Sequence, residues 1–163
     1  MDSRLHCATR PPRDGGSVRL ALAAFVLGAV LAISFVAEAI AQAGNLSATI
    51  LPSAARTAAT VNSPDQQNRT WSGVHVVVDV SAFVSGTYTP KIQGKDPVSG
   101  NYYDIITGTA IGGVSTNTLK VYPKITPAAN AAVSDVLPRV WRVQLNGAGG
   151  QSMTFSVGAN FQQ

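Results

Sequence analysis

The sequence predicts an all-β protein, a two-layer β-sandwich that follows an N-terminal hydrophobic helix. Charged residues make up only 12% of the chain, against about 25% in typical globular domains. The 15 glycines and 9 prolines favour short strands joined by turns over long helices, whose exposed faces need Glu and Lys. Stretches in which apolar and polar residues alternate recur along the chain, which is the pattern of half-buried strands.

The hydrophobic segment is Leu20–Val36, an uncharged apolar run preceded by arginines and followed by Ala41-Gln42-Ala43. This order is typical of a secretory signal peptide cleaved before Gly44. An uncleaved membrane anchor with a cytoplasmic N-terminus is a second interpretation. A mis-called start, with translation beginning near Gly44, is a third. All three place residues 1–43 outside the fold and residues 44–163 in a single β-sandwich domain.

The first strands are expected between residues 46 and 80. Leu46–Leu51 is a β-rich run interrupted by Pro52, and Arg56–Val61 is a second run that ends at the turn-forming residues Asn62–Asp65. Val74–Val80 is the clearest strand of the chain, because its four even-numbered valines share one face by the period of two. We expect that face to lie on the core and the opposite face to contact solvent.

A hairpin is expected next, with strands Thr87–Gly94 and Tyr102–Thr107 on either side of Lys95–Asn101. The connection has Pro directly after Asp and a Gly further on, which is the chemistry of a tight turn. Leu119–Tyr122 then predicts a strand stopped by the following proline. The Ala-rich stretch Pro127–Val133 predicts a loop with one helical turn.

The C-terminal part predicts a second hairpin. Val140–Leu145 alternates apolar and polar residues, Asn146–Gly150 is rich in glycine, and Ser152–Phe161 is again β-rich. The total is seven or eight strands, which a two-layer sandwich buries economically. Jelly-roll and immunoglobulin-like topologies both stay open, and a small barrel is the alternative architecture.

Charge and cysteine content limit the function classes. From Gly44 onward the eight Lys/Arg and five Asp are dispersed, and the nearest approach to a basic cluster is Arg139 with Arg142. Nucleic-acid binding is therefore not expected, because such surfaces cluster their cations. The only cysteine, Cys7, precedes the hydrophobic segment, so no disulfide or Cys-ligated zinc site is expected in the domain.

No residue pattern points to catalysis. His75 is the only histidine after the hydrophobic segment, and no Gly-x-Ser-x-Gly motif occurs. The domain contains no glutamate, and its aspartates include turn residues such as Asp65 and Asp96. The glycine pairs do not open a helix with a following Lys-Ser/Thr, so a phosphate loop is not indicated. We expect no enzymatic activity, no catalytic residue, no metal site and no cofactor.

The aromatic residues have two interpretations. The tryptophans and tyrosines could form a platform that stacks on sugars, but packing in the core is the commoner fate of such side chains. Tyr102 and Tyr103 are neighbours on a predicted strand and therefore face opposite ways, so that one of them is expected to be exposed. Together with Lys95 and Asp96 of the same hairpin, they form the predicted contact surface. The C-terminal strand is a further candidate for such contacts.

Six segments of the domain share a pattern with known sequences: Ala48–Thr57, Gly73–Val80, Ile92–Gly100 with Tyr102-Tyr103, Val121–Pro123, Leu137–Arg139 and Trp141–Val143. Through these segments the domain resembles a group of small proteins encoded by tailed bacteriophages and prophages near virion structural genes. Proteins of that group generally begin near the position of Gly44.

This resemblance implies a structural or accessory virion protein that acts by self-association or by contact with other virion proteins. The alternative is an exported module that binds a carbohydrate or a surface. The expected location is the virion if the chain is phage-encoded and the start is mis-called. Otherwise the protein is exported or membrane-anchored, with the membrane contacted only through residues 20–36.

Overall fold

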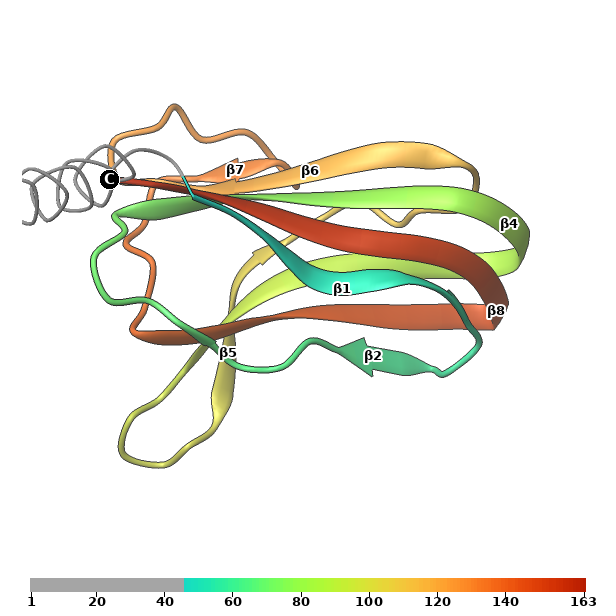
Figure 1. Ribbon diagram of the computed structural model, residues 1–163, viewed down its shortest axis with the longest axis horizontal. Helices are drawn as coiled ribbons and strands as arrows, with labels where there is room; N and C mark the ends of the chain where they lie inside the picture. The colour runs from blue at the N-terminus through green and yellow to red at the C-terminus, as the bar shows by residue number, and fades with distance from the viewer. Residues whose placement is uncertain (1–45) are drawn as a thin grey trace, which may run out of the picture. The chain divides into compact units, whose positions relative to one another are not determined.

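The computed structural model describes residues 46–163, which are all-β: they form one sheet of eight strands and contain no helix (Figure 1). The predicted N-terminal helix and the signal-peptide or anchor segment lie outside the described residues. The strands are β1 (Leu46–Arg56), β2 (Thr60–Asn62), β3 (Gln66–Gln67), β4 (Gly73–Lys95), β5 (Tyr102–Thr107), β6 (Ser115–Val121), β7 (Ala132–Val133) and β8 (Val140–Gln162).

Two long strands organise the sheet. β4 and β8 have 23 residues each and pair antiparallel from end to end, so that Gly73 lies opposite Gln162 and Gly94 lies opposite Trp141. Both strands bend near their middle, and the two-stranded ribbon turns back on itself (Figure 1). The remaining strands add to the sides of this ribbon.

The bend occurs where the pairing of β4 with β8 is irregular. Three register shifts fall between Val80 and Thr87 of β4, and such bulges bend a strand and increase its twist. Gly86 has a φ of 72°, and Gly149 and Gly150 on β8 have φ values of 75° and 64°. Only glycine adopts this left-handed backbone at low cost, so both strands can turn at the same place.

The bend divides the sheet into two halves that face each other, which is consistent with a β-sandwich. In one half, the first part of β4 and the last part of β8 are flanked by β6 and β1, and β7 joins β6 in parallel. In the other half, the second part of β4 and the first part of β8 are flanked by β5 and by β2 with β3.

The core lies between these halves. The even-numbered valines of β4 from Val74 to Val80 are at most 2% exposed, which confirms the face predicted from the sequence. Trp141, Val143 and Leu145 of β8 are fully buried, as their alternation predicts. Tyr88 packs edge-on against Phe155 with ring centroids 5.2 Å apart. Its hydroxyl donates a hydrogen bond of 2.8 Å to the carbonyl of Ala58, so this buried polar group is satisfied.

Three local predictions are wrong. The glycine-rich stretch at residues 146–150 does not close a hairpin, because β8 runs through it and both of its parts pair with β4. Pro52 does not end β1, which continues to Arg56 with register shifts on either side of the proline. This is possible because β1 is an edge strand, where a missing N–H costs no ladder hydrogen bond. The prediction for Pro127–Val133 is wrong in its last two residues, which form β7. The rest is a loop with one turn, in which the Ala131 and Ala132 N–H groups donate to the Ala128 carbonyl and Asn130 has a φ of 57°.

We expect the Gly86→Ala substitution to lower the free energy of unfolding by roughly 2–4 kcal/mol. A Cβ at this position would lie 2.5 Å from Gln151 Cα and 2.7 Å from the Ala148 carbonyl oxygen, in addition to the left-handed strain. Gly150→Ala is the matched control, because its φ is also positive but no atom lies within 4 Å of the added carbon. In urea denaturation, Gly150→Ala should lower the free energy of unfolding by only about 1–2 kcal/mol. Equal losses of unfolding free energy in the two variants would show that the close contacts of Gly86 do not stabilise the bend.

Candidate functional site

The hairpin that joins β4 to β5 is built around Asp96. Its carboxylate accepts hydrogen bonds from the Val98 N–H at 2.9 Å and from the Ser99 hydroxyl at 2.7 Å, and its carbonyl accepts the Gly100 N–H. The bond from Ser99, and then that from Val98, lowers the pKa of Asp96. Gly100 has a φ of 72°, as the turn chemistry predicts. Val98 at the tip is 94% exposed.

Tyr102 ties the base of this hairpin to the rest of the sheet. The Tyr102 ring lies 3.4 Å from the Arg142 guanidinium carbon, and its hydroxyl donates a hydrogen bond of 2.6 Å to Asp65. Lys95 Nζ lies 2.8 Å from the other oxygen of the same carboxylate. The Lys95 and Tyr102 hydrogen bonds lower the pKa of Asp65, and the Asp65 carboxylate raises the pKa of Lys95.

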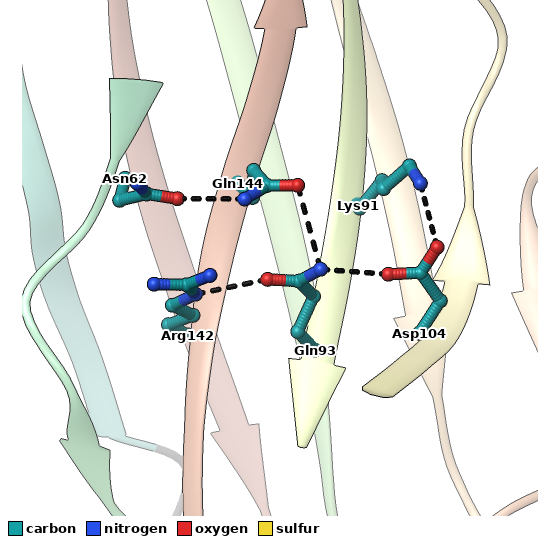
Figure 2. A network of polar contacts seen from close by, with 6 residues as sticks. All are labelled: Asn62, Lys91, Gln93, Asp104, Arg142 and Gln144. Carbon is teal, nitrogen blue, oxygen red and sulfur yellow. Dashed lines mark hydrogen bonds and ion pairs between the residues drawn. The ribbon is translucent and has the colours of Figure 1, made fainter. Parts of the chain in front are cut away.

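A polar network continues from Arg142 across the outer face of this half of the sheet (Figure 2). Arg142 Nε donates to Gln93 Oε1 at 2.9 Å, and Gln93 Nε2 donates to Asp104 Oδ1 at 2.7 Å. Asp104 is also 2.6 Å from Lys91 Nζ, and the pKa of Asp104 is lowered first by Gln93 and then by Lys91. The network links β8, β4 and β5, so the side chains on this face are held in fixed positions.

A pocket of about 570 Å³ lies beside the hairpin. Tyr103, which is 49% exposed, forms one wall. Its ring lies against Gly94, where a Cβ would come within 2.5 Å of Tyr103 Cζ and 2.8 Å of Pro138 Cγ. A second pocket of about 590 Å³ shares Gln67 and Arg139 with the first. The first pocket is lined by Asp65, Gln67, Lys95, Asp96, Pro97, Gly100, Tyr103, Pro138, Arg139 and Val140.

Three of the four predicted contact residues therefore line one pocket: Lys95, Asp96 and Tyr103. The fourth, Tyr102, does not line the pocket but contacts two residues that do: its hydroxyl donates to Asp65, and its ring lies 5.2 Å from Lys95 Nζ. Gln67 was not predicted as a site residue; it reaches the pocket because it pairs with Val140 on β8. Arg139 could have been predicted, since Arg139 and Arg142 are the nearest approach to a basic cluster in the domain. The C-terminal part of β8 lies between β1 and β4, so neither of its edges is open to another strand.

A second surface lies at the bend of the ribbon. Phe83 and Val84 are 39% and 74% exposed there, and Val114 is 67% exposed. Val114 lies near them because its loop runs from Ile111, opposite Tyr88, to the start of β6, opposite Val80. We call Phe83, Val84 and Val114 the bend patch. The segments 80–90, 105–119 and 143–163 contain no charged residue. Arg56 of β1 lies nearby, because it pairs with Met153, the partner of Phe83.

Among residues 46–163, no group of three or more His, Cys, Asp or Glu is placed to hold a metal ion. Within the same residues no helix is long and apolar enough to cross a membrane; residues 20–36 lie outside them. Comparison with protein families, curated proteins and solved structures found no match.

We expect Tyr102→Phe to raise the pKa of Asp65 towards its ordinary value, because the phenylalanine keeps the ring beside Arg142 but cannot donate to the carboxylate. The free energy of unfolding should fall by about 1 kcal/mol or less, since solvent screens this exposed site. Carboxylate NMR titration and urea denaturation would measure the two effects. Tyr103→Phe is the control, because the Tyr103 hydroxyl makes no hydrogen bond with another described residue. An unchanged Asp65 titration in Tyr102→Phe would refute the assignment.

The domain should become less stable in acid. The folded state lowers the pKa of Asp65 and of Asp104, so the unfolded chain binds more protons as the pH falls through the usual range of a carboxyl group. The stabilisation is complete above that range and is lost as the pH approaches the lowered values. Urea midpoints measured between pH 7 and pH 2 should fall less in the Asp65→Asn/Asp104→Asn variant than in the wild type. Parallel profiles would show that these carboxylates do not contribute.

Proposed function

We propose that this chain is a non-enzymatic structural or accessory phage-type virion protein that acts through protein–protein contacts and oligomerisation. The observation that carries the proposal is the bend patch, where three large apolar side chains are exposed and the segments of β4 and β8 that form the bend carry no charge. Charged residues are depleted at the centres of protein interfaces, and exposed apolar patches mark interaction sites. The resemblance of the sequence to small virion-module proteins supports the same conclusion.

The order of the strands supports a jelly-roll topology for the proposed two-layer β-sandwich. When the two-residue β7 is left out, the two halves of β4 and of β8 are counted separately, and β2 and β3 are counted as one strand, there are eight segments in chain order. They form the neighbours 1-8-3-6 in one half of the sheet and 2-7-4-5 in the other. This is the order of the jelly roll, which occurs in viral capsid and lectin domains. The immunoglobulin order ABED/CFG differs. The functional part of this argument is an analogy between folds.

The bend patch is suited to association because its position is fixed. Gly86 packs directly on Gln151 and Ala148, so the two strands support each other where they turn. A surface that is already ordered loses little conformational entropy on binding. We propose that the bend patch contacts a second copy of the chain or another virion protein, and that the hairpin tip at Val98 adds a smaller contact.

A second candidate function is an exported module that binds a carbohydrate or a surface. The specific observation in its favour is the pocket beside Tyr103, which combines a half-exposed aromatic ring with amide, carboxylate and guanidinium groups. An aromatic face with a few well-placed polar groups is the usual composition of a ligand site. This candidate uses a different surface from the first, and the two can be tested separately.

The virion role is tested by mass spectrometry of particles purified from cells that express the full chain from its own genome. We expect the chain to be a stoichiometric component, and its complete absence from particles would contradict the proposal. Val84→Asp should reduce the number of copies per particle roughly tenfold, because burying an unpaired charge in a contact is costly. Val136→Asp is the matched control, since Val136 is similarly exposed at 66% but lies outside the bend patch. Equal incorporation of the two variants would exclude the bend patch.

A further inference from the structure

We propose that the pocket beside Tyr103 binds an acidic saccharide, with the carboxylate of a sugar acid on Arg139 and a sugar ring on Tyr103. The inference rests on the second candidate function and names its ligand class. Three observations carry the inference. Arg139 is the cation of the pocket that no carboxylate of residues 46–163 pairs with, the Tyr103 ring is supported from behind, and the lining offers few backbone groups to which a peptide could add as a strand.

The pocket contains one cation that is not neutralised by its neighbours. Asp65 accepts hydrogen bonds on both oxygens, from Lys95 and Tyr102, and thereby pairs the charge of Lys95. Asp96 uses both of its oxygens within the hairpin turn. The Arg139 guanidinium, in contrast, makes no ion pair or hydrogen bond with any side chain of residues 46–163, and Arg139 is exposed. The Asp96 carboxylate accepts hydrogen bonds only from neutral donors and keeps its charge, so the pocket as a whole has no excess positive charge. A guanidinium binds a carboxylate through two parallel hydrogen bonds, so Arg139 itself can hold an anionic group of a ligand.

The aromatic wall is rigid. The Tyr103 ring lies across Gly94 and next to Pro138, which leaves about half of the residue exposed. Behind it, Gly94 pairs with the fully buried Trp141, so the strand that supports the ring is part of the core. A flat, supported ring offers an apolar surface on which a sugar ring can stack, and the neighbouring Gln67 amide can both donate to and accept from hydroxyl groups.

The lining favours a saccharide over a peptide. An extended peptide binds by adding a strand to an open sheet edge. β3, which lines the pocket, has only two residues. β5, whose other edge pairs with no described strand, contributes only Tyr103 to the lining. The neighbouring backbone groups are already paired: the Asn68 N–H with the Arg139 carbonyl at 2.7 Å, and the Asp96 N–H with the Asn101 carbonyl at 2.8 Å. The pocket therefore offers side-chain groups and an aromatic face, which is what a sugar requires.

The position of Arg139 fits a chain of sugars rather than a single one. Arg139 and Gln67 line both pockets, whose volumes are about 570 Å³ and about 590 Å³, and each is within the range of small-ligand sites. Arg69, a second exposed arginine, lines the pocket farther from Tyr103. An oligosaccharide with repeated carboxylates could place one on Arg139 and another near Arg69.

The test uses the full-length chain in a detergent without sugar headgroups and two matched probes, tetragalacturonate and its fully methyl-esterified form. Esterification removes the charge and keeps the sugar rings. We expect isothermal titration calorimetry to show that the acid binds at least roughly tenfold more tightly than the ester. Arg139→Gln should reduce this difference severalfold, with any remainder due to Arg69, whereas Tyr103→Ala should weaken both probes. Lys124→Gln, which removes an exposed cation that does not line either pocket, should change neither affinity.

The other outcomes are distinguishable. Equal binding of acid and ester, unchanged in Arg139→Gln, would overturn the acidic specificity and leave a carbohydrate-binding function standing. Failure of both probes to bind the wild-type chain would overturn both the inference and the second candidate function. Binding of tetraglutamate as tight as that of tetragalacturonate, with the same dependence on Arg139 and Tyr103, would overturn the inference in favour of an acidic peptide. Circular dichroism melting curves would verify that each variant is folded.

Discussion

The pairing of β4 with β8 along their whole length is the constraint on which the rest of the domain depends. Each strand contributes its first half to one side of the core and its second half to the other, so the two sides cannot be assembled independently. Every other strand adds to an edge of this ribbon or, in the case of β7, to β6. The bend at Gly86 therefore determines how the inward faces of the valines and of Trp141 meet, and also leaves Phe83 and Val84 exposed.

The same pairing explains the different character of the two ends of the domain. At the bend, the chain turns through glycines and small residues, and no charged side chain is needed to hold the strands together. At the opposite end, the strands separate into loops, and the structure relies on polar contacts: Asp65 with Lys95 and Tyr102, then Arg142 with Gln93. The exposed apolar bend patch and the polar pocket with an aromatic wall thus lie at opposite ends of the ribbon.

The sequence predicted the features that depend on neighbouring residues. The core face of Val74–Val80, the alternation of Val140–Leu145 and the turn at Asp96 all follow from local periodicity or local turn chemistry, and the structure confirms them. The C-terminal hairpin was predicted wrongly because a glycine-rich stretch permits a reversal of the chain as readily as a bend. Which of the two occurs depends on β4, whose residues Thr87–Thr89 pair with this stretch from about 60 residues away in the sequence. The pocket was only partly predictable for the same reason, since Gln67 meets Val140 through pairing that no local pattern reveals.

The late position of β8 in the chain has a consequence for how the protein is made. Residues 73–80 pair with residues 155–162, and loops of that length close slowly because nonlocal contacts must form before the core is stabilised. During synthesis, the valine-rich half of β4 leaves the ribosome long before its principal partner exists. The domain therefore cannot complete its core until the last part of β8 has been synthesised, and until then a β-prone segment is exposed to aggregation.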